Sequence, residues 1–333
     1  YEDRFREDRT MYHLSEDINV DFIDNSQFVN KHHTPAFCAR YLVKKLNDRS
    51  GLFNKKSLNP ILAEAIFSKK TREKWVEYFN SQDYDVILTT ASLSLRLAMI
   101  APRLKAATIG WQHNCYDGYL HVKPVVFWQQ ENLLQQYLPN LDRYIVLSDY
   151  DKRDYMEKLG IDCEVKINPR SFVSEKKCDV KSKRFLMATR FVYAKGLDLM
   201  MESFEEFCKE DSEWELDIIG DGDLFDQIRA DAKKRHLEKR VHFVGYTNEP
   251  EKYYLNSSVF LLPSRWEGWP MVIMEAFEFG LPVIAYHMGA MDLIIDDGKT
   301  GFLPEAFDPH KFAQAMLKLA HDEELRARMS ANA

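Results

Sequence analysis

Short apolar runs alternate along the chain with longer stretches in which apolar residues recur at helical spacing. In the first half the runs "INVDFI", "DVILTT", "AATIGWQH" and "RYIVLS" are bounded by polar or turn residues, which predicts buried strands. "CEVKINPRSF" is expected to be one more strand, ending in Asn-Pro. Residues 59–79 keep Ile61, Ala65, Trp75 and Phe79 at a helical period with charges opposite, which predicts helical structure.

A polar, lysine-rich stretch, "SEKKCDVKSK" at residues 174–183, interrupts this pattern and is expected to be a linker. The alternation then restarts at residue 184. Strands are predicted at residues 184–189, 214–220, 241–246, 258–264, 282–287 and 301–304. Helices are predicted between them, at residues 196–210, 223–236, 251–257, 271–280 and 290–295. We therefore expect an N-terminal domain at residues 1–173 and a C-terminal domain at residues 184–333.

Alternation of strands and helices is typical of parallel sheets with helices on both faces. Two such runs around a linker predict an α/β protein with two doubly wound domains that face each other. Ligands of open α/β sheets bind beyond the carboxyl ends of the strands, so the predicted site is the cleft between the domains.

Composition narrows the function classes. The chain has 333 residues, a length that suits two domains. A net charge of −7 gives no global electrostatic reason to expect nucleic-acid binding. No apolar run reaches the roughly 18 residues of a membrane span, and the charged start "YEDRFREDRT" is unlike a signal peptide. Five scattered cysteines without a CxxC pair indicate free thiols in a reducing cytoplasm and no metal site.

Both ends of the sequence suggest a fragment of a longer chain. There is no initial Met, and "EELRARMSANA" stops inside a helical pattern. We expect an incomplete last helix and a missing first strand.

Two cations follow the strand at residues 184–189. Arg190 ends this strand region, and Lys195 and Gly196 lie on the loop into the next helix. A helix N-terminus favours anions, and a guanidinium fork with an ammonium suits a diphosphate. Two solvated surface cations would give the same spacing. The turn "GDG" at residues 220–222 is not a GxGxxG motif and by itself indicates only a tight strand-to-helix turn.

Two glutamates flank a Gly-Trp-Pro turn in "PSRWEGWPMVIMEAFE". Glu267 follows a strand, so it should face the cleft, and Gly268 would let a ligand approach the backbone. Pro270 suits the first turn of the next helix, which carries Glu275. A carboxylate there would accept hydrogen bonds from two adjacent hydroxyls, as on a ribose. Solvated glutamates remain the alternative for both positions.

His113 stands at the carboxyl end of the strand in "AATIGWQH", with Asn114 after it. A histidine in this position could hydrogen-bond or carry a proton near neutral pH. A structural histidine with satisfied hydrogen bonds is the alternative.

Taken in order, these segments resemble family 4 glycosyltransferases of the GT-B type. The resemblance is strongest from Arg184 to Pro304, through "ATRFVYAKGLDLMMESF", "WELDIIGDGDLFDQI", "VHFVGYTNE", "SVFLLPSRWEGWPMVIMEAFEFGLPVIA" and "MGAMDLIIDDGKTGFLP". The first half resembles the acceptor-side domain more loosely, through "YDVILTT", "IGWQHN", "YIVLS" and "INP".

The resemblance implies a retaining transfer of a sugar from a nucleotide diphospho-sugar, with no metal and no cofactor. Arg190 and Lys195 would neutralise the diphosphate leaving group, and Glu267 would lie near the donor sugar. His113 would reach that sugar from the other domain. The resemblance also implies four donor-binding residues. Glu275 would bind the ribose, and the other three are Gly268, Trp269 and Tyr246.

The family setting implies synthesis of a bacterial surface polysaccharide or glycolipid in the cytoplasm. UDP is favoured as the nucleotide by family frequency alone. A saccharide or lipid-linked saccharide acceptor is implied, with peripheral contact at the inner membrane face as an option. "VFWQQENLLQQYL" is apolar enough to be considered for that contact, although a core helix is the favoured interpretation. Asp292 stands where many members carry Glu, which puts one contact there in doubt.

Three alternatives remain. One is a non-catalytic nucleotide-sugar-binding subunit that assists a partner transferase, although the intact set of Arg190, Lys195, Glu267 and Glu275 argues against a degenerate site. A dinucleotide oxidoreductase is disfavoured, because no GxGxxG follows a strand. A GT-B epimerase or a sucrose-type synthase is a minor rival.

Overall fold

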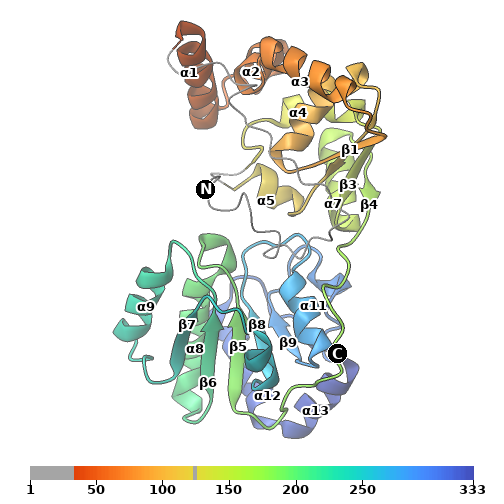
Figure 1. The fold of residues 1–333 in the computed structure, drawn as a ribbon. Helices are drawn as coiled ribbons and strands as arrows, with labels where there is room; N and C mark the ends of the chain where they lie inside the picture. The colour runs from red at the N-terminus through yellow and green to blue at the C-terminus, as the bar shows by residue number, and fades with distance from the viewer. Residues whose placement is uncertain (1–33, 123–125) are drawn as a thin grey trace.

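The structure is a computed structural model that describes residues 34–122 and 126–333. The strand expected at residues 18–23 lies outside the described residues. The chain forms two halves, one above the other in Figure 1, each built around its own parallel sheet. This arrangement confirms the predicted α/β class.

The N-terminal half holds a four-stranded sheet in the order β1-β2-β3-β4, with every neighbouring pair parallel. Its strands are β1 Val86–Thr90, β2 Ala107–Trp111, β3 Arg143–Val146 and β4 Glu164–Val165. Its helices are α1 Pro35–Ser50, α2 Asn59–Ile66, α3 Lys69–Ser81, α4 Ser92–Ile100, α5 Tyr116–Leu120, α6 Glu131–Tyr137 and α7 Asp149–Asp154.

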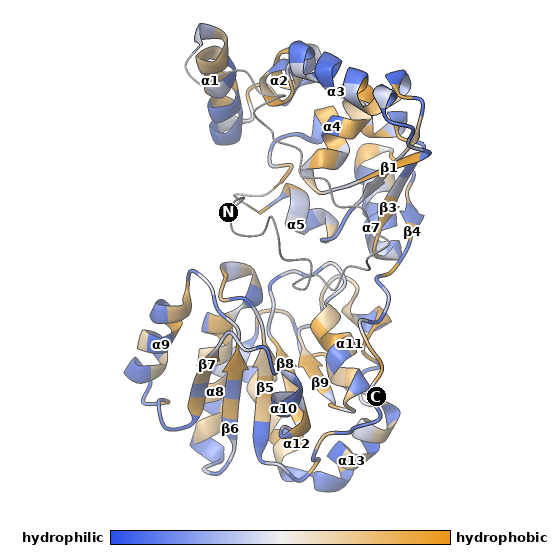
Figure 2. Cartoon of the chain, in the orientation of Figure 1, coloured by the Kyte–Doolittle hydropathy of each residue, from blue (hydrophilic) through white to orange (hydrophobic). Residues whose placement is uncertain are grey.

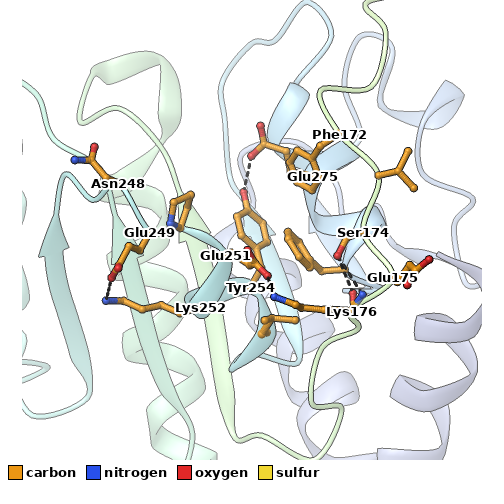
Figure 3. A pocket seen from close by; sticks show the side chains of 14 residues that line it. Phe172, Ser174, Glu175, Lys176, Asn248, Glu249, Glu251, Lys252, Tyr254 and Glu275 are labelled. Atoms are coloured by element: carbon orange, nitrogen blue, oxygen red, sulfur yellow. Dashed lines mark hydrogen bonds and ion pairs between the residues drawn. The ribbon is translucent and has the colours of Figure 1, made fainter. Parts of the chain in front are cut away.

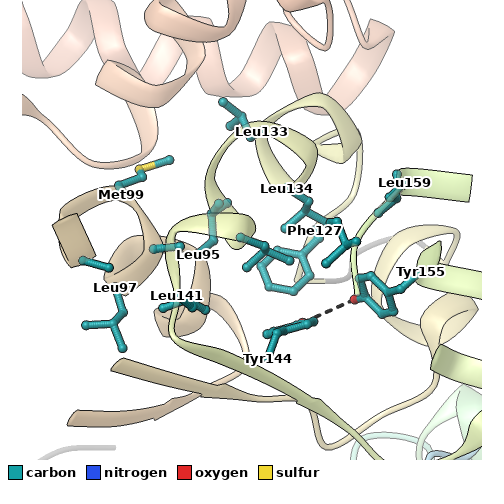
Figure 4. Close-up of a cluster of buried hydrophobic side chains, with 14 of the residues drawn as sticks. Leu95, Leu97, Met99, Phe127, Leu133, Leu134, Leu141, Tyr144, Tyr155 and Leu159 are labelled. Atoms are coloured by element: carbon teal, nitrogen blue, oxygen red, sulfur yellow. Dashed lines mark hydrogen bonds between the residues drawn. The ribbon is translucent and has the colours of Figure 1, made fainter. Parts of the chain in front are cut away.

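The core of this half gathers apolar side chains from α4, α6 and the strands (Figure 4). Phe127, Leu133 and Leu134 are fully buried there. Residues 126–138 therefore belong to the core, as the favoured interpretation of "VFWQQENLLQQYL" predicts. Two buried hydroxyls in the same core, those of Tyr144 and Tyr155, lie 3.3 Å apart within hydrogen-bond distance, so neither is left without a partner.

The C-terminal half holds a six-stranded parallel sheet in the order β10-β9-β8-β5-β6-β7. Its strands are β5 Arg184–Ala188, β6 Glu215–Ile219, β7 Val241–Gly245, β8 Val259–Leu262, β9 Val283–Ala285 and β10 Gly301–Phe302. Its helices are α8 Leu197–Glu210, α9 Phe225–Lys234, α10 Glu251–Leu255, α11 Met271–Glu278, α12 Pro309–His321 and α13 Glu323–Asn332. Counted from β5, the order reverses between β5 and β8, which makes this edge the topological switch point.

Alternate residues of β5 pack on opposite faces of this sheet. Phe185 and Met187 join a buried cluster that includes side chains of α8, α9 and α12. Leu186 and Ala188 join another that includes α10 and α11. Figure 2 shows the strands as apolar and the outer faces of helices such as α9 as polar. The sheet is covered on both faces, which is the doubly wound arrangement that the alternation predicts.

The lysine-rich segment at residues 174–183 has no helix or strand, but it is attached to the C-terminal half. The backbone N–H groups of Cys178 and Asp179 donate to the carbonyls of Phe279 (2.7 Å) and Leu255 (3.0 Å). The Arg326 side chain donates to the Val180 carbonyl at 3.0 Å. The segment connects the sheets in sequence, but these bonds make it part of the second half.

Several elements differ from the sequence prediction. The helical stretch at residues 59–79 is broken at Phe67 and Ser68, because the Ser68 hydroxyl accepts the Thr71 N–H at 3.2 Å and starts α3 as a new helix. The strand expected at residues 163–172 is reduced to β4, and the helix expected at residues 290–295 is the 3₁₀ turn Met291–Leu293. The prediction also missed α1, α4 and α12.

Candidate active site at the cleft between the halves

Two loops meet at the switch point of the C-terminal sheet. The loop after β5 carries Arg190 and Lys195, and the loop after β8 carries Glu267 and Gly268. The Arg265 N–H donates to the Ala194 carbonyl at 2.7 Å, which ties the loops together.

Gly196 makes the close approach of these loops possible. Its φ is +63°, and a Cβ there would lie 2.0 Å from the Pro263 carbonyl oxygen. Only glycine fits this combination of left-handed backbone and contact.

Lys195 and Glu267 form an ion pair at this junction. The Lys195 Nζ lies 2.6 Å from the Glu267 Oε1, and the side chains are 19% and 9% exposed. The Ser264 hydroxyl donates to the same carboxylate oxygen at 2.6 Å. Glu267 is therefore fixed by two donors, one of which is the Lys195 ammonium. Ser264 was not predicted as a site residue, although it lies three residues before Glu267.

The two arginines at this site differ in their partners. Arg265 donates to the Asp198 carboxylate through two bonds of 2.8 and 2.6 Å, and this hydrogen bonding lowers the pKa of Asp198. Arg190 is exposed, and its guanidinium has no hydrogen bond or ion pair within the described part of the chain. Arg190 is thus the guanidinium of the two that remains available for an anionic ligand.

Gly268 lies at the contact between the halves. A Cβ at Gly268 would lie 2.7 Å from the Cα of Asn114. In the same contact, a Cβ at Gly118 would lie 2.7 Å from the Trp266 ring. The missing side chain of Gly268 therefore lets the backbone of the N-terminal half approach, a constraint that the sequence could not reveal.

His113 directly precedes Asn114, so it lies beside this contact. Its ring stacks on Trp111 with the ring centroids 5.1 Å apart. Partial burial lowers the pKa of His113 below its ordinary value of 6.5. The imidazole is therefore predominantly neutral near pH 7, a form that donates from one nitrogen and accepts at the other.

A pocket of about 400 Å³ opens between the halves beside Glu267. Cys115, Tyr150 and Asp151 line it from the N-terminal half, and Trp266 and Glu267 from the C-terminal half. Aromatic rings and hydrogen-bonding groups in one enclosed space suit a polyhydroxylated ring.

Glu275 lies on α11 at the wall of a groove of about 1070 Å³ (Figure 3). Its Oε2 accepts the Tyr254 hydroxyl at 2.9 Å. That hydrogen bond orients the carboxylate and leaves its other oxygen open to a ligand. Burial, with the Glu275 charge beside it, raises the pKa of Tyr254, so the phenol remains a donor. Sequence reasoning missed Tyr254, which stands 21 positions before Glu275.

Trp269 and Tyr246 differ in position. Trp269 is half-buried after Gly268, and its indole Nε1 is buried without a hydrogen-bond partner in the described part of the chain. Tyr246 follows β7, two strands from the switch point, and is 75% exposed. The structure thus brings Lys195, Glu267 and Gly268 together beside Asn114, while Tyr246 stands apart at the end of β7.

Asp292 connects the two halves. Its Oδ2 accepts the Tyr150 hydroxyl at 2.6 Å, across 142 positions of sequence. The aspartate that departs from the family pattern therefore has a partner in the N-terminal half.

The chemistry available at this cleft is electrostatic and hydrogen-bonding. Two cations and the loop before α8 suit a diphosphate, and two carboxylates suit hydroxyl groups. Among residues 34–122 and 126–333, no group of three or more His, Cys, Asp or Glu side chains is placed to hold a metal ion. Within the same ranges, no helix is both long and apolar enough to cross a bilayer.

The two facing parallel sheets and the site between them define a GT-B fold. Residues 171–333 match the family model described as glycosyl transferases group 1. The match covers the C-terminal half of the chain and confirms the resemblance to this family of glycosyltransferases that the motifs from Arg184 to Pro304 predict.

Three similar proteins support this placement. An uncharacterised glycosyltransferase of Haemophilus influenzae is 26% identical over 252 residues, which cover 74% of this chain and 69% of that protein. The poly(glycerol-phosphate) alpha-glucosyltransferase of Bacillus subtilis is 30% identical over 150 residues, which cover 44% and 22%. The fold is shared with a point mutant of Staphylococcus aureus TarM, which was solved in complex with fondaparinux, alpha-GlcNAc-glycerol and UDP. The TM-score is 0.69 at 21% sequence identity, and the match covers 78% of this chain and 54% of TarM. The chain thus spans about half of TarM.

Proposed function

We propose that the protein transfers a sugar from a nucleotide diphospho-sugar to a saccharide or lipid-linked saccharide acceptor, with retention of anomeric configuration. The observation that carries this proposal is the meeting of Lys195 and Glu267 at the switch point, with their side-chain atoms 2.6 Å apart. Open α/β sheets bind ligands at this place. The motifs on which the family resemblance rests supply both residues.

In the proposed reaction, the bond between the sugar C1 and the diphosphate oxygen breaks as the acceptor oxygen bonds to C1 from the same face, and the proton of the acceptor hydroxyl passes to the departing diphosphate. Negative charge develops on the diphosphate, and Arg190 and Lys195 stabilise it. Glu267, fixed by Ser264, accepts hydrogen bonds from the donor sugar. The neutral imidazole of His113 offers a further hydrogen bond from the other half.

The nucleoside is proposed to lie beside Glu275, in the groove of Figure 3. The ribose hydroxyls would donate to the Glu275 oxygen that Tyr254 leaves free. Trp269 and Tyr246 are proposed as further donor-binding residues, on the family resemblance. The complex of TarM with UDP supports UDP as the nucleotide here.

The proposed setting is the synthesis of a bacterial cell-surface polymer in the cytoplasm. The name of the Bacillus subtilis relative specifies a poly(glycerol-phosphate) acceptor and an alpha-glucosyl product. Because common UDP-hexoses carry an α-linked sugar, an α-linked product means retention of configuration. That product supports the retaining assignment.

Nucleotide binding tests the donor site. Isothermal titration would compare UDP, GDP, ADP and NAD on the wild type and on Lys195→Ala. We expect one nucleoside diphosphate to bind, and the substitution to weaken it by about 10- to 100-fold through loss of a charge-assisted contact. Binding of NAD alone would overturn the transferase assignment.

Turnover separates an enzyme from a non-catalytic subunit that only binds a nucleotide sugar. Release of the nucleoside diphosphate from the corresponding sugar nucleotide would be followed with the full chain. Binding without any release, with acceptors present, would favour the non-catalytic alternative.

A further inference from the structure

Helix α1 presents an unusual outward face. Its inner face is attached by Asn47, which is buried and donates to the Gln129 carbonyl at 2.7 Å. The Trp128 indole donates to the Asp48 carbonyl at 2.9 Å on the same side. Residues at spacings i+3, i+4 and i+8 from Cys38 lie on the opposite, outward side.

That outward side carries large apolar side chains where a surface helix usually carries polar ones. Tyr41 and Leu42 are each 56% exposed, and Leu46 is 48% exposed. Leu52, just beyond the helix, is 47% exposed. Figure 1 places α1 at the end of the N-terminal half that lies away from the second half, so the second half does not cover this face.

Basic residues are frequent in the segment that carries these apolar side chains, and Lys44, Lys45 and Arg49 are exposed on α1 itself. Residues 34–58 contain six lysines and arginines and one acidic residue, Asp48, although the whole chain has a net charge of −7. None of these cations forms an ion pair within the described part of the chain. The basic residues of the segment are Arg40, Lys44, Lys45, Arg49, Lys55 and Lys56.

Exposed apolar side chains beside cations that form no ion pair, on α1 and the turn that follows it, match an interfacial membrane helix. The apolar groups enter the acyl boundary, and lysine and arginine stems extend toward the headgroups. A nucleic acid would meet the cations but would leave Leu42 and Leu46 in water. A second copy of this chain would bring another set of cations against the first.

We propose that residues 35–56 form a docking surface for an anionic lipid bilayer, called here the α1 surface. The occupant is the anionic membrane itself, because its headgroups offer negative charge to the cations and its interior offers an apolar environment to the exposed apolar side chains. This inference is independent of the proposed sugar transfer, since the α1 surface contains none of the proposed site residues.

Vesicle co-sedimentation of the full chain tests the proposal. We expect binding to vesicles that contain phosphatidylglycerol, weak binding to vesicles of phosphatidylcholine alone, and loss of binding as salt screens the charges. Each basic residue near an anionic surface strengthens partitioning about fivefold. The double substitution Lys44→Gln/Lys45→Gln should therefore lower the partition constant about 30-fold.

The matched control is Lys233→Gln/Lys234→Gln, which removes two adjacent exposed lysines from α9 on the other half. Leu42→Ser/Leu46→Ser removes apolar side chains without a change of charge, and it should weaken binding roughly tenfold or more. Circular dichroism would confirm that each variant is folded, and nucleotide titration should give unchanged affinities.

Three outcomes would overturn the proposal. The first is equal or absent binding to the two kinds of vesicle. The second is an equal loss of binding in the α9 control. The third is self-association of the chain, measured by light scattering, without any lipid binding. If Leu42→Ser/Leu46→Ser abolished that self-association, the α1 surface would be a contact between copies of the chain.

Discussion

The ammonium group of Lys195 lies 2.6 Å from the carboxylate of Glu267, although 72 positions separate the two residues in sequence. Each side chain comes from the loop after a different strand, and the pair marks the point where the strand order of the sheet reverses. A cation and a carboxylate are thus held together at the edge where a diphospho-sugar would place its phosphate and its hydroxyl groups.

Replacement of Glu267 by Gln should separate binding from turnover. The amide keeps the size of the side chain but loses the charge that the donor sugar would meet. We expect turnover, measured as release of the nucleoside diphosphate, to fall by about 10²- to 10³-fold. That is the usual loss when one electrostatic contact is removed from an active site. Nucleoside diphosphate affinity should stay equal or rise, because Lys195 loses its competing partner. Unchanged turnover in Glu267→Gln would remove Glu267 from the reaction.

Glu275→Gln should weaken ribose recognition. The amide oxygen still accepts from Tyr254, but the charge-assisted bonds to the ribose hydroxyls are lost, which predicts a fall in affinity of about 10-fold or more. The wild type should also prefer UDP over 2′-deoxyuridine diphosphate, and the variant should lose part of that preference.

Glu249→Gln provides the control for Glu275→Gln, because Glu249 lines the same groove and its partner is the exposed Lys252. An equal loss of affinity in both variants would indicate a general charge effect in the groove and would contradict a ribose contact at Glu275.

Gly268→Ala should disturb the closed contact between the halves. The added methyl group would lie 2.7 Å from the Asn114 Cα, so the halves must separate. A displacement of about 1 Å at a reacting centre costs roughly 10²-fold in rate, and we expect a loss of that order. Small-angle scattering would detect the change in shape. Full activity with an unchanged scattering profile would show that the contact is not required.

His113 should make stability depend on pH below its ordinary pKa of 6.5. Burial lowers the pKa in the folded state, so the unfolded chain binds a proton at a higher pH than the folded chain does. Stability therefore decreases as pH falls through about 6.5, and it is fully retained above that value. Thermal unfolding of wild type and His113→Asn between about pH 5 and pH 8 would test this; equal pH slopes in the two proteins would contradict it.

The apolar pattern was sufficient to predict most strands, because a strand such as β8 is buried on both sides and so reads as an unbroken apolar run. The order of loops and strands also placed Lys195 and Glu267 at carboxyl ends of strands that must share one sheet edge. Their pairing, the Tyr254 bond to Glu275 and the approach of Asn114 to Gly268 could not be predicted. Each depends on the spatial proximity of residues that are distant in sequence.

The predicted boundaries of the helix at residues 59–79 were wrong for a local reason. Residues 59–79 keep a helical period of apolar side chains, but Ser68 accepts a backbone N–H and starts a second helix. The period of the apolar residues does not reveal such an N-cap, because the apolar positions on either side of it continue almost in phase.

The attachment of residues 174–183 affects how the protein should be divided for expression. The carbonyls of Phe279 and Leu255 accept N–H groups from this segment, and Arg326 donates to it. A C-terminal piece that starts at Arg184 would leave these groups exposed, whereas one that starts at Ser174 would keep them satisfied. The modular unit therefore begins before the lysine-rich segment, and a swap of donor-binding halves between related transferases should place its junction there.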